Sequence, residues 1–327
     1  MRTTIQSDPC VAASHRTRRS TAQPTAPRGF TLVEILVVIG IVVLLVALLL
    51  PALAGVRTKA LETQTLSAMQ DFSKACDFFF QEHGQYPGIV PDDILANNPI
   101  ISSTQNAMLH LMGGYVRETD VGTASFNADY NAPDWTELNF GGFRVKVNLG
   151  LLGAGPVING RQYSPYLTPV EGQLRVVQGA AYAALTDLPT LIDAWGQPLA
   201  YVRRARPIGP LTGPIASQPQ FYLETISPYI ESESLGEFGK RQLDGGATDD
   251  WSVLNDGGNR YDNFAQIVQH QALPGTPRGE YVIISAGRDG IFFSRYDGPG
   301  SASDPIGVIS VPALVEEYND LVVVGGG

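Results

Sequence analysis

The hydrophobic pattern is strongest near the N-terminus of the chain. Every residue from Ile35 to Leu50 is apolar, and one ionisable side chain, Glu34, lies just before this run. A helix over residues 30–50 rises about 1.5 Å per residue and is roughly 32 Å long, enough to cross a hydrocarbon core of about 30 Å. We therefore predict a membrane-spanning helix over residues 30–50. A carboxylate in such a segment costs free energy in lipid, so Glu34 is expected to have a function.

The helical pattern continues beyond Pro51. Apolar residues recur there at helical spacing, and charged residues occupy the other positions of the helical wheel. The apolar positions are Leu66, Met69, Phe72, Cys76, Phe79 and Phe80. A proline inside a helix bends it, so a kink is expected at Pro51. Gly84 and Pro87 are typical of a helix end. The pattern predicts one helix over residues 30–83, whose second half packs on the rest of the chain.

Residues 84–327 are predicted to form a globular domain. Runs rich in β-branched or aromatic residues predict strands at 143–149, 199–202, 281–285 and 321–324. A short helix is predicted over residues 105–112. Two stretches, 88–190 and 203–278, are predicted as insertions: a loop region with one or two helices and short strands, and a region with an exposed acidic loop at 230–258. The predicted fold class is α+β, a long helix packed on a small antiparallel β-sheet with large loop insertions.

Charge is distributed unevenly along the chain. Residues 1–29 contain five arginines and one acidic residue, whereas the whole chain has a net charge of −10. A basic segment before a membrane helix stays in the cytoplasm, which directs the C-terminal part outward. The acidic remainder argues against a nucleic-acid-binding surface.

The segment Gly29-Phe30-Thr31-Leu32-Val33-Glu34, with the apolar run and Pro51 after it, resembles the N-terminus of type IV pilins and type II secretion pseudopilins. In that family a prepilin peptidase cleaves after the glycine and methylates the new first residue. The resemblance implies removal of a leader, residues 1–29, methylation of Phe30, an assembly role for Glu34 and a kink at Pro51. It also implies an inner-membrane protein whose C-terminal domain is periplasmic.

Two further stretches resemble the major pseudopilin. Residues 193–202 contain Asp-Ala-Trp-Gly-Gln-Pro before a strand, and residues 280–293 resemble the C-terminal hairpin with its Ser-x-Gly-x-Asp-Gly turn. Family members bind calcium near that hairpin, which implies a calcium site formed by Asp289, Asp297 and Asp320. Asp-Gly pairs also form ordinary turns, so both interpretations stay open.

The cysteine content favours the pseudopilin branch. Loss of Cys10 with the leader leaves Cys76 alone, so the mature chain has no intrachain disulfide. Many type IV pilins have a disulfide in their C-terminal region, whereas pseudopilins commonly use calcium there.

The resemblance implies a structural subunit of a type II secretion pseudopilus or a related type IV pilus-like filament. Its partners would be the prepilin peptidase, other pilin or pseudopilin subunits, the inner-membrane assembly platform and membrane lipid. The sequence contains no HExxH, Gly-x-Ser-x-Gly or complete phosphate-loop motif, so no enzymatic activity is predicted. Two alternatives remain: a secretory signal peptide cleaved after Ala54, and a periplasmic binding or enzymatic domain on a pilin-like anchor.

Overall fold

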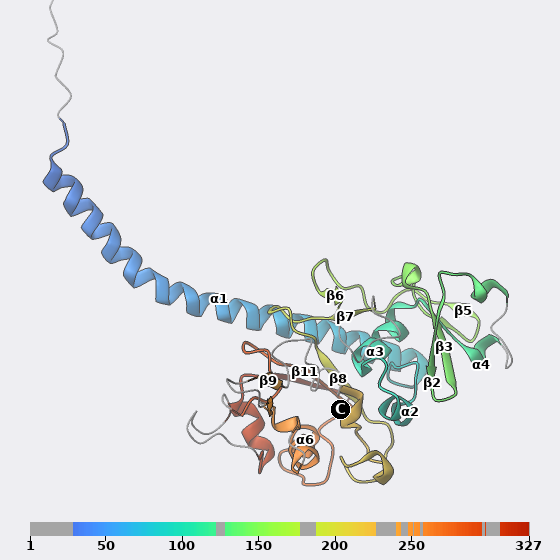
Figure 1. The fold of residues 1–327 in the computed structure, drawn as a ribbon. Helices are drawn as coiled ribbons and strands as arrows, with labels where there is room; N and C mark the ends of the chain where they lie inside the picture. The colour runs from blue at the N-terminus through green and yellow to red at the C-terminus, as the bar shows by residue number, and fades with distance from the viewer. Residues whose placement is uncertain are drawn as a thin grey trace, which may run out of the picture. The chain divides into compact units, whose positions relative to one another are not determined.

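The computed structural model describes residues 29–121, 128–176, 188–226, 240–242, 248–250, 252–255, 258–295, 298 and 308–326 (Figure 1). The chain forms two compact units, Met1–Leu53 and Ala54–Gly327. The mixed α+β class with small antiparallel sheets is confirmed.

Helix α1 extends over Leu32–His83 and passes through Pro51 without losing its helical backbone. Its predicted end is confirmed, because Gly84 follows with a φ of +70°, a conformation that glycine adopts without steric cost. The boundary between the two units falls inside this helix, so the kink at Pro51 stays a prediction.

The central sheet of residues 54–327 has three antiparallel strands in the order β12-β11-β8. They are β8 (Ala200–Arg203), β11 (Tyr281–Ser285) and β12 (Leu321–Gly325). Ile283 of the middle strand lies opposite Tyr201 on one side and Val323 on the other. All three strands were expected from the sequence, and all are confirmed within one or two residues.

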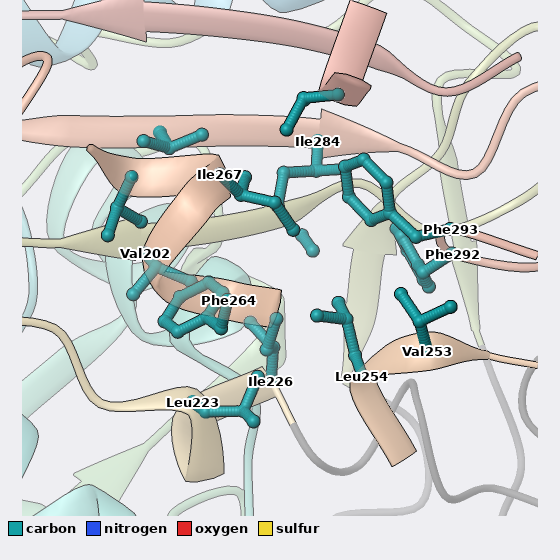
Figure 2. Close-up of a cluster of buried hydrophobic side chains, with 14 of the residues drawn as sticks. Val202, Leu223, Ile226, Val253, Leu254, Phe264, Ile267, Ile284, Phe292 and Phe293 are labelled. Atoms are coloured by element: carbon teal, nitrogen blue, oxygen red, sulfur yellow. The ribbon is translucent and has the colours of Figure 1, made fainter. Parts of the chain in front are cut away.

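Both faces of this sheet are buried. On one face, Tyr201 and Ile283 belong to a cluster with α1 residues such as Phe72. On the other face, Val202 and Ile284 belong to a cluster with residues of α6 (Arg260–Val268), as Figure 2 shows. All five residues of β11 are buried. A strand covered on both faces needs apolar residues in succession, which explains the run Tyr-Val-Ile-Ile in β11.

The apolar stripe of α1 is confirmed at four of its six predicted positions, and Leu66 is only partly buried. Met69, Phe72, Cys76 and Phe79 have no exposed surface. Phe80 was expected in the core, but 41% of its surface is exposed. It lies one position beyond Phe79, about 100° further round the helix, and its ring stacks on Tyr86 with centroids 4.5 Å apart.

The region 88–190 forms the expected helices and short strands, but its description as a loop region is wrong. It has its own three-stranded sheet and an apolar core that includes Leu138, Phe140 and Val145. Its elements are α2 (Asp92–Asn97), α3 (Ser103–Met112), β1 (Tyr115–Arg117), α4 (Glu118–Val121), β2 (Thr136–Phe140), β3 (Phe143–Val147), β4 (Val157–Ile158), β5 (Arg161–Gln162), β6 (Leu174–Val176) and β7 (Pro189–Leu191).

Helix α3 covers the outer edge of strand β8. Ser102 caps the helix in a capping box with Gln105. The Ser103 hydroxyl donates to the carbonyl oxygen of Tyr201. The Thr104 hydroxyl donates to the Leu199 carbonyl at 2.7 Å and accepts from the Tyr201 N–H at 3.0 Å. Side chains of a helix therefore satisfy the backbone groups that a fourth strand would otherwise bind.

The region 203–278 also packs more than expected. It contains α6 and the paired strands β9 (Lys240–Gln242) and β10 (Thr248–Asp250). Much of the acidic loop expected at 230–258 lies outside the described residues. Within it, Val253 and Leu254 are buried against the sheet, so the expectation of an exposed loop is wrong there.

The prediction of a hairpin that turns at Asp289-Gly290 is wrong. Residues 287–290 do form a turn, but no strand follows directly, and β11 pairs instead with β12, which begins at Leu321. Phe292 and Phe293 are fully buried beside the sheet (Figure 2). Burial of these two rings holds the chain after the turn in the core, so it cannot run back along β11 as a strand.

Candidate functional site: the N-terminal motif and the aspartate loops

The proposed cleavage site lies just before the first turn of α1. Gly29, Phe30 and Thr31 precede the helix and all are exposed, with 80% of the Phe30 surface accessible. A peptide bond outside regular structure is open to a protease because its backbone can adopt the extended form that cleavage needs. The geometry at Gly29 and Phe30 is therefore compatible with processing.

Glu34 has a local role that the sequence analysis missed. Its Oε2 accepts hydrogen bonds from the Thr31 N–H and hydroxyl, both at 2.8 Å, and the Glu34 N–H donates to the Thr31 hydroxyl at 3.2 Å. This is a capping box, and its signal was present in the sequence as Thr-x-x-Glu before an apolar run. The carboxylate is thereby held at the helix N-terminus, next to Phe30, where processing would create an amine.

The first half of α1 exposes its apolar side chains. From Leu32 to Leu48 the large hydrophobic residues have 46% to 78% of their surface accessible. Counted over the described residues alone, no helix is both long and apolar enough to cross a membrane. The side chains of residues 49–52 lie outside that description.

The two stretches that resemble pseudopilin loops lie side by side. The Ser285 hydroxyl donates to Asp193 Oδ2 at 2.7 Å, and the backbone N–H groups of Trp195 and Gln197 donate to Asp193 Oδ1 at 2.9 and 2.8 Å. The N–H of Ala194 donates to the buried hydroxyl of Thr65 on α1 at 3.0 Å. Asp193 therefore joins the Trp-Gly turn to the end of β11, and the turn itself is attached to the long helix.

Asp193 gives the domain a pH-dependent stability. Only 4% of this residue is exposed, and burial raises the pKa of its carboxyl to about 6, from an ordinary value of 3.8. The folded state then binds a proton more tightly than the unfolded state. The contribution of Asp193 to the free energy of unfolding is therefore largest below about pH 4. It falls as the pH rises to about 6 and is constant above that.

We expect the Asp193→Asn variant to lack this slope. Asparagine keeps an acceptor for the N–H groups of Trp195 and Gln197 and donates to Ser285, but it does not titrate. The stability of wild type relative to the variant should fall by up to about 3 kcal/mol between pH 4 and pH 7. Thermal melting of both proteins at the two pH values measures this change. A difference that does not vary with pH would contradict the assignment.

Asp289 and Asp320 each have a structural partner. Asp289 Oδ1 accepts from the Ile291 N–H at 3.0 Å. Both carboxylate oxygens of Asp320 accept from the Phe293 N–H, at 2.9 and 3.0 Å. Phe293 has a φ of +50°, which is unfavourable for a bulky residue, and these bonds help to hold it.

The loops that carry these two aspartates touch each other. A Cβ atom added at Gly287 would lie 2.5 Å from the Asn319 carbonyl oxygen, so a side chain there would clash. Asp297 lies outside the described residues. Among the residues described, no three or more His, Cys, Asp or Glu side chains are grouped to hold a metal ion.

A separate cavity of about 720 Å³ lies beside the end of α1. Four arginines line it: Arg117, Arg203, Arg204 and Arg206. Three of them are in ion pairs: Arg117 with Asp120, Arg203 with Asp92, and Arg204 with Glu280. The cavity is therefore polar and nearly neutral, and most of its charges already stabilise the fold.

The chain was compared with protein-family models, curated proteins and solved structures. No protein-family model matches the chain, and no curated protein or solved structure matches it either.

Proposed function

We propose that the protein is a structural subunit of a type II secretion pseudopilus or a related type IV pilus-like filament. In this proposal the prepilin peptidase removes residues 1–29, residues 30–50 anchor the mature protein in the inner membrane, and the pilin-like C-terminal domain is periplasmic. The observation that carries it is the exposed apolar surface of α1 from Leu32 to Leu48, directly after an accessible Gly29-Phe30 bond. Such a surface needs lipid or other apolar helices around it.

The C-terminal domain offers independent support. The two loops that resemble pseudopilin elements are far apart in the sequence, yet they share the Asp193–Ser285 hydrogen bond and adjacent strands. The sheet that carries them packs on α1 through the cluster around Phe72 and Tyr201. A long helix with a small antiparallel sheet on its C-terminal half is the arrangement expected of a pilin-like subunit.

Processing at Gly29 is the first test of this proposal. We expect Gly29→Leu to block cleavage, because the peptidase of the family that the chain resembles cleaves after a glycine, and the full-length form should accumulate in the membrane fraction. Gly55→Leu is the matched control, since Gly55 lies beyond the apolar run, away from the cleaved bond, and a Cβ added at either glycine meets no atom within 4 Å. A blot of the membrane fraction distinguishes the two lengths. Equal cleavage of wild type and Gly29→Leu would refute processing at this bond.

Calcium binding at the aspartate loops is part of the same proposal. Asp289, Asp297 and Asp320 would supply oxygen ligands, the ligand type that calcium prefers. Removal of the ion would leave neighbouring carboxylates to repel each other, so a chelator should lower the melting temperature of wild type. Asp289→Ala should remove that sensitivity. A melting temperature indifferent to both chelator and added calcium would exclude the site.

A second candidate is a membrane-anchored periplasmic binding domain. The arginine-lined cavity is the observation in its favour, because a polar concave site of that size can hold a small ligand. Affinity purification of the tagged full-length chain separates the two candidates. A filament subunit should bring down other pilin-like proteins and assembly-platform components, whereas a binding domain should retain a small molecule and none of these.

A further inference from the structure

The two edges of the central sheet differ. The edge of β8 is covered by α3, whose Ser103 and Thr104 bind the outward backbone groups of Leu199 and Tyr201. The other edge is β12, and the sheet contains no strand beyond it among the described residues. Within the same part of the chain, nothing hydrogen-bonds to the outward backbone groups of β12.

The strand register identifies those outward groups. Backbone groups in an antiparallel sheet alternate between the two neighbours. Because Tyr201 directs its N–H and C=O towards α3, its partner Ile283 on β11 must direct its own towards β12. Val323, the partner of Ile283, therefore points inward. Val322 and Val324 point their N–H and C=O groups away from the sheet.

Strand β12 also lacks the features that normally protect an edge. Its sequence is Leu-Val-Val-Val-Gly, without proline or charge, and it pairs with β11 in unbroken register. Soluble proteins usually place lysine, proline or a bulge at such an edge to prevent pairing with another strand. The charged residue directly before the strand, Asp320, is buried and accepts from the Phe293 N–H. The edge is therefore competent to accept a strand.

We propose that this edge pairs with β12 of a second copy of the chain, antiparallel and centred on Val323. In that register Val322 of one copy lies opposite Val324 of the other, so each outward N–H meets an outward C=O. Val323 faces its own counterpart, and Asp320 lies opposite Gly326, so no like charges meet. The contact is two-fold symmetric: the same edge, β12, is used by both copies, and no second surface of the chain is needed.

The pairing would also extend the two cores of the sheet. Leu321 and Val323 pack against one apolar cluster, and Val322 and Val324 against the other. Cross-strand valine pairs would continue both clusters over the join. A five-residue strand buries little area, so the contact is weak between free molecules. Anchoring two copies in one membrane would raise their effective concentration and favour it.

This contact goes beyond the proposed function, since it joins folded domains through a sheet and does not involve Glu34 or the apolar helix. It is testable with Val323→Cys in the full-length chain, in membranes, with Cys10 replaced by serine. Paired residues at a non-hydrogen-bonded position have Cα atoms about 4.5 Å apart, within the range that a disulfide bridges. Cys76 is fully buried and stays in place.

We expect mild oxidation to convert the Val323→Cys protein into a disulfide-linked dimer, and to leave Val311→Cys, a control at an exposed position, largely monomeric. Adding Val322→Pro should abolish the dimer, because it removes an outward N–H that the pairing needs and none of the bonds to β11. Melting of the variant measures the cost of losing the valine side chain from its apolar cluster. Val324→Pro serves the same purpose if the first variant melts early.

Three outcomes would each overturn the proposal. The first is the absence of dimer when alkylation shows that the thiol introduced by Val323→Cys is accessible. The second is a dimer that survives both proline substitutions. The third is a crosslink to a different protein in place of a second copy of the chain.

Discussion

Replacing Glu34 by valine should leave membrane insertion and cleavage intact and abolish incorporation into filaments. An ionised carboxylate in lipid costs a few kcal/mol on insertion scales, so the variant helix inserts at least as readily. After cleavage, the amine of Phe30 would be positively charged near neutral pH. In a filament this amine can pair with Glu34 of a neighbouring subunit where water is excluded, and the charge pair would set the axial register. Shearing of filaments, with a membrane-fraction blot alongside, measures both steps.

The capping box requires a control, because Glu34 also stabilises the first turn of α1 through Thr31. Glu34→Gln is that control: glutamine completes a capping box but carries no charge. If the charge pair drives assembly, the glutamine and valine variants should both be cleaved and both fail to enter filaments. Assembly of the glutamine variant alone would assign the residue to capping, and assembly of both would remove Glu34 from the mechanism.

Replacing Arg203 by methionine should destabilise the C-terminal domain by about 3–5 kcal/mol. Arg203 Nε donates to Asp92 Oδ2 at 2.7 Å, and its side chain is only 15% exposed, with that of Asp92 at 6%. The same guanidinium donates to the carbonyl oxygens of Tyr86 at 2.7 Å and Val90 at 3.2 Å. Methionine keeps the apolar stem of the side chain but not the guanidinium, so it leaves a buried carboxylate and two carbonyls without these donors.

Two matched variants show whether the buried charge is the cause. The double variant Arg203→Met with Asp92→Asn removes the uncompensated charge and should recover part of the loss. Arg117→Met breaks the Asp120 pair, in which both side chains are about one-quarter exposed, and should cost about 1 kcal/mol or less. Thermal melting of the full-length protein in one detergent compares all three. A loss for Arg203→Met no larger than that for Arg117→Met would contradict the role of the buried pair.

The elements of the α1-and-sheet layer could be predicted because their signals are local. The apolar stripe through Phe72 and Phe79, the cap at Gly84 and the β-branched run of β11 each follow from the sequence alone. The insertions were harder, because glycine and proline obscure the period of short elements. Most of α3 was predicted, as a helix over residues 105–112, although the helix is buried throughout its length and has no polar face. Helix α6 was not predicted, because its nine residues give the buried pattern of Asn263, Phe264, Ile267 and Val268 too few turns to stand out.

The site was only partly predictable for a related reason. Gly29, Phe30 and Glu34 are recognisable as a contiguous motif, whereas Asp193 and Ser285 come together through strand pairing across many residues. Phe292 and Phe293 follow an Asp-Gly turn that favours a hairpin, and their burial beside β8 and β11 prevails over that local preference. Long-range packing of this kind leaves no periodic trace in one sequence.

The intact mass of the membrane-bound protein tests the central claim most directly. If the chain is a processed filament subunit, the mass should correspond to a chain that starts at Phe30 and carries one methyl group on its amine. The Gly29→Leu variant should show the mass of the unprocessed chain. A mass that starts at Gly55 would identify a secretory signal peptide, and it would contradict the anchor, the assembly role of Glu34 and the filament together.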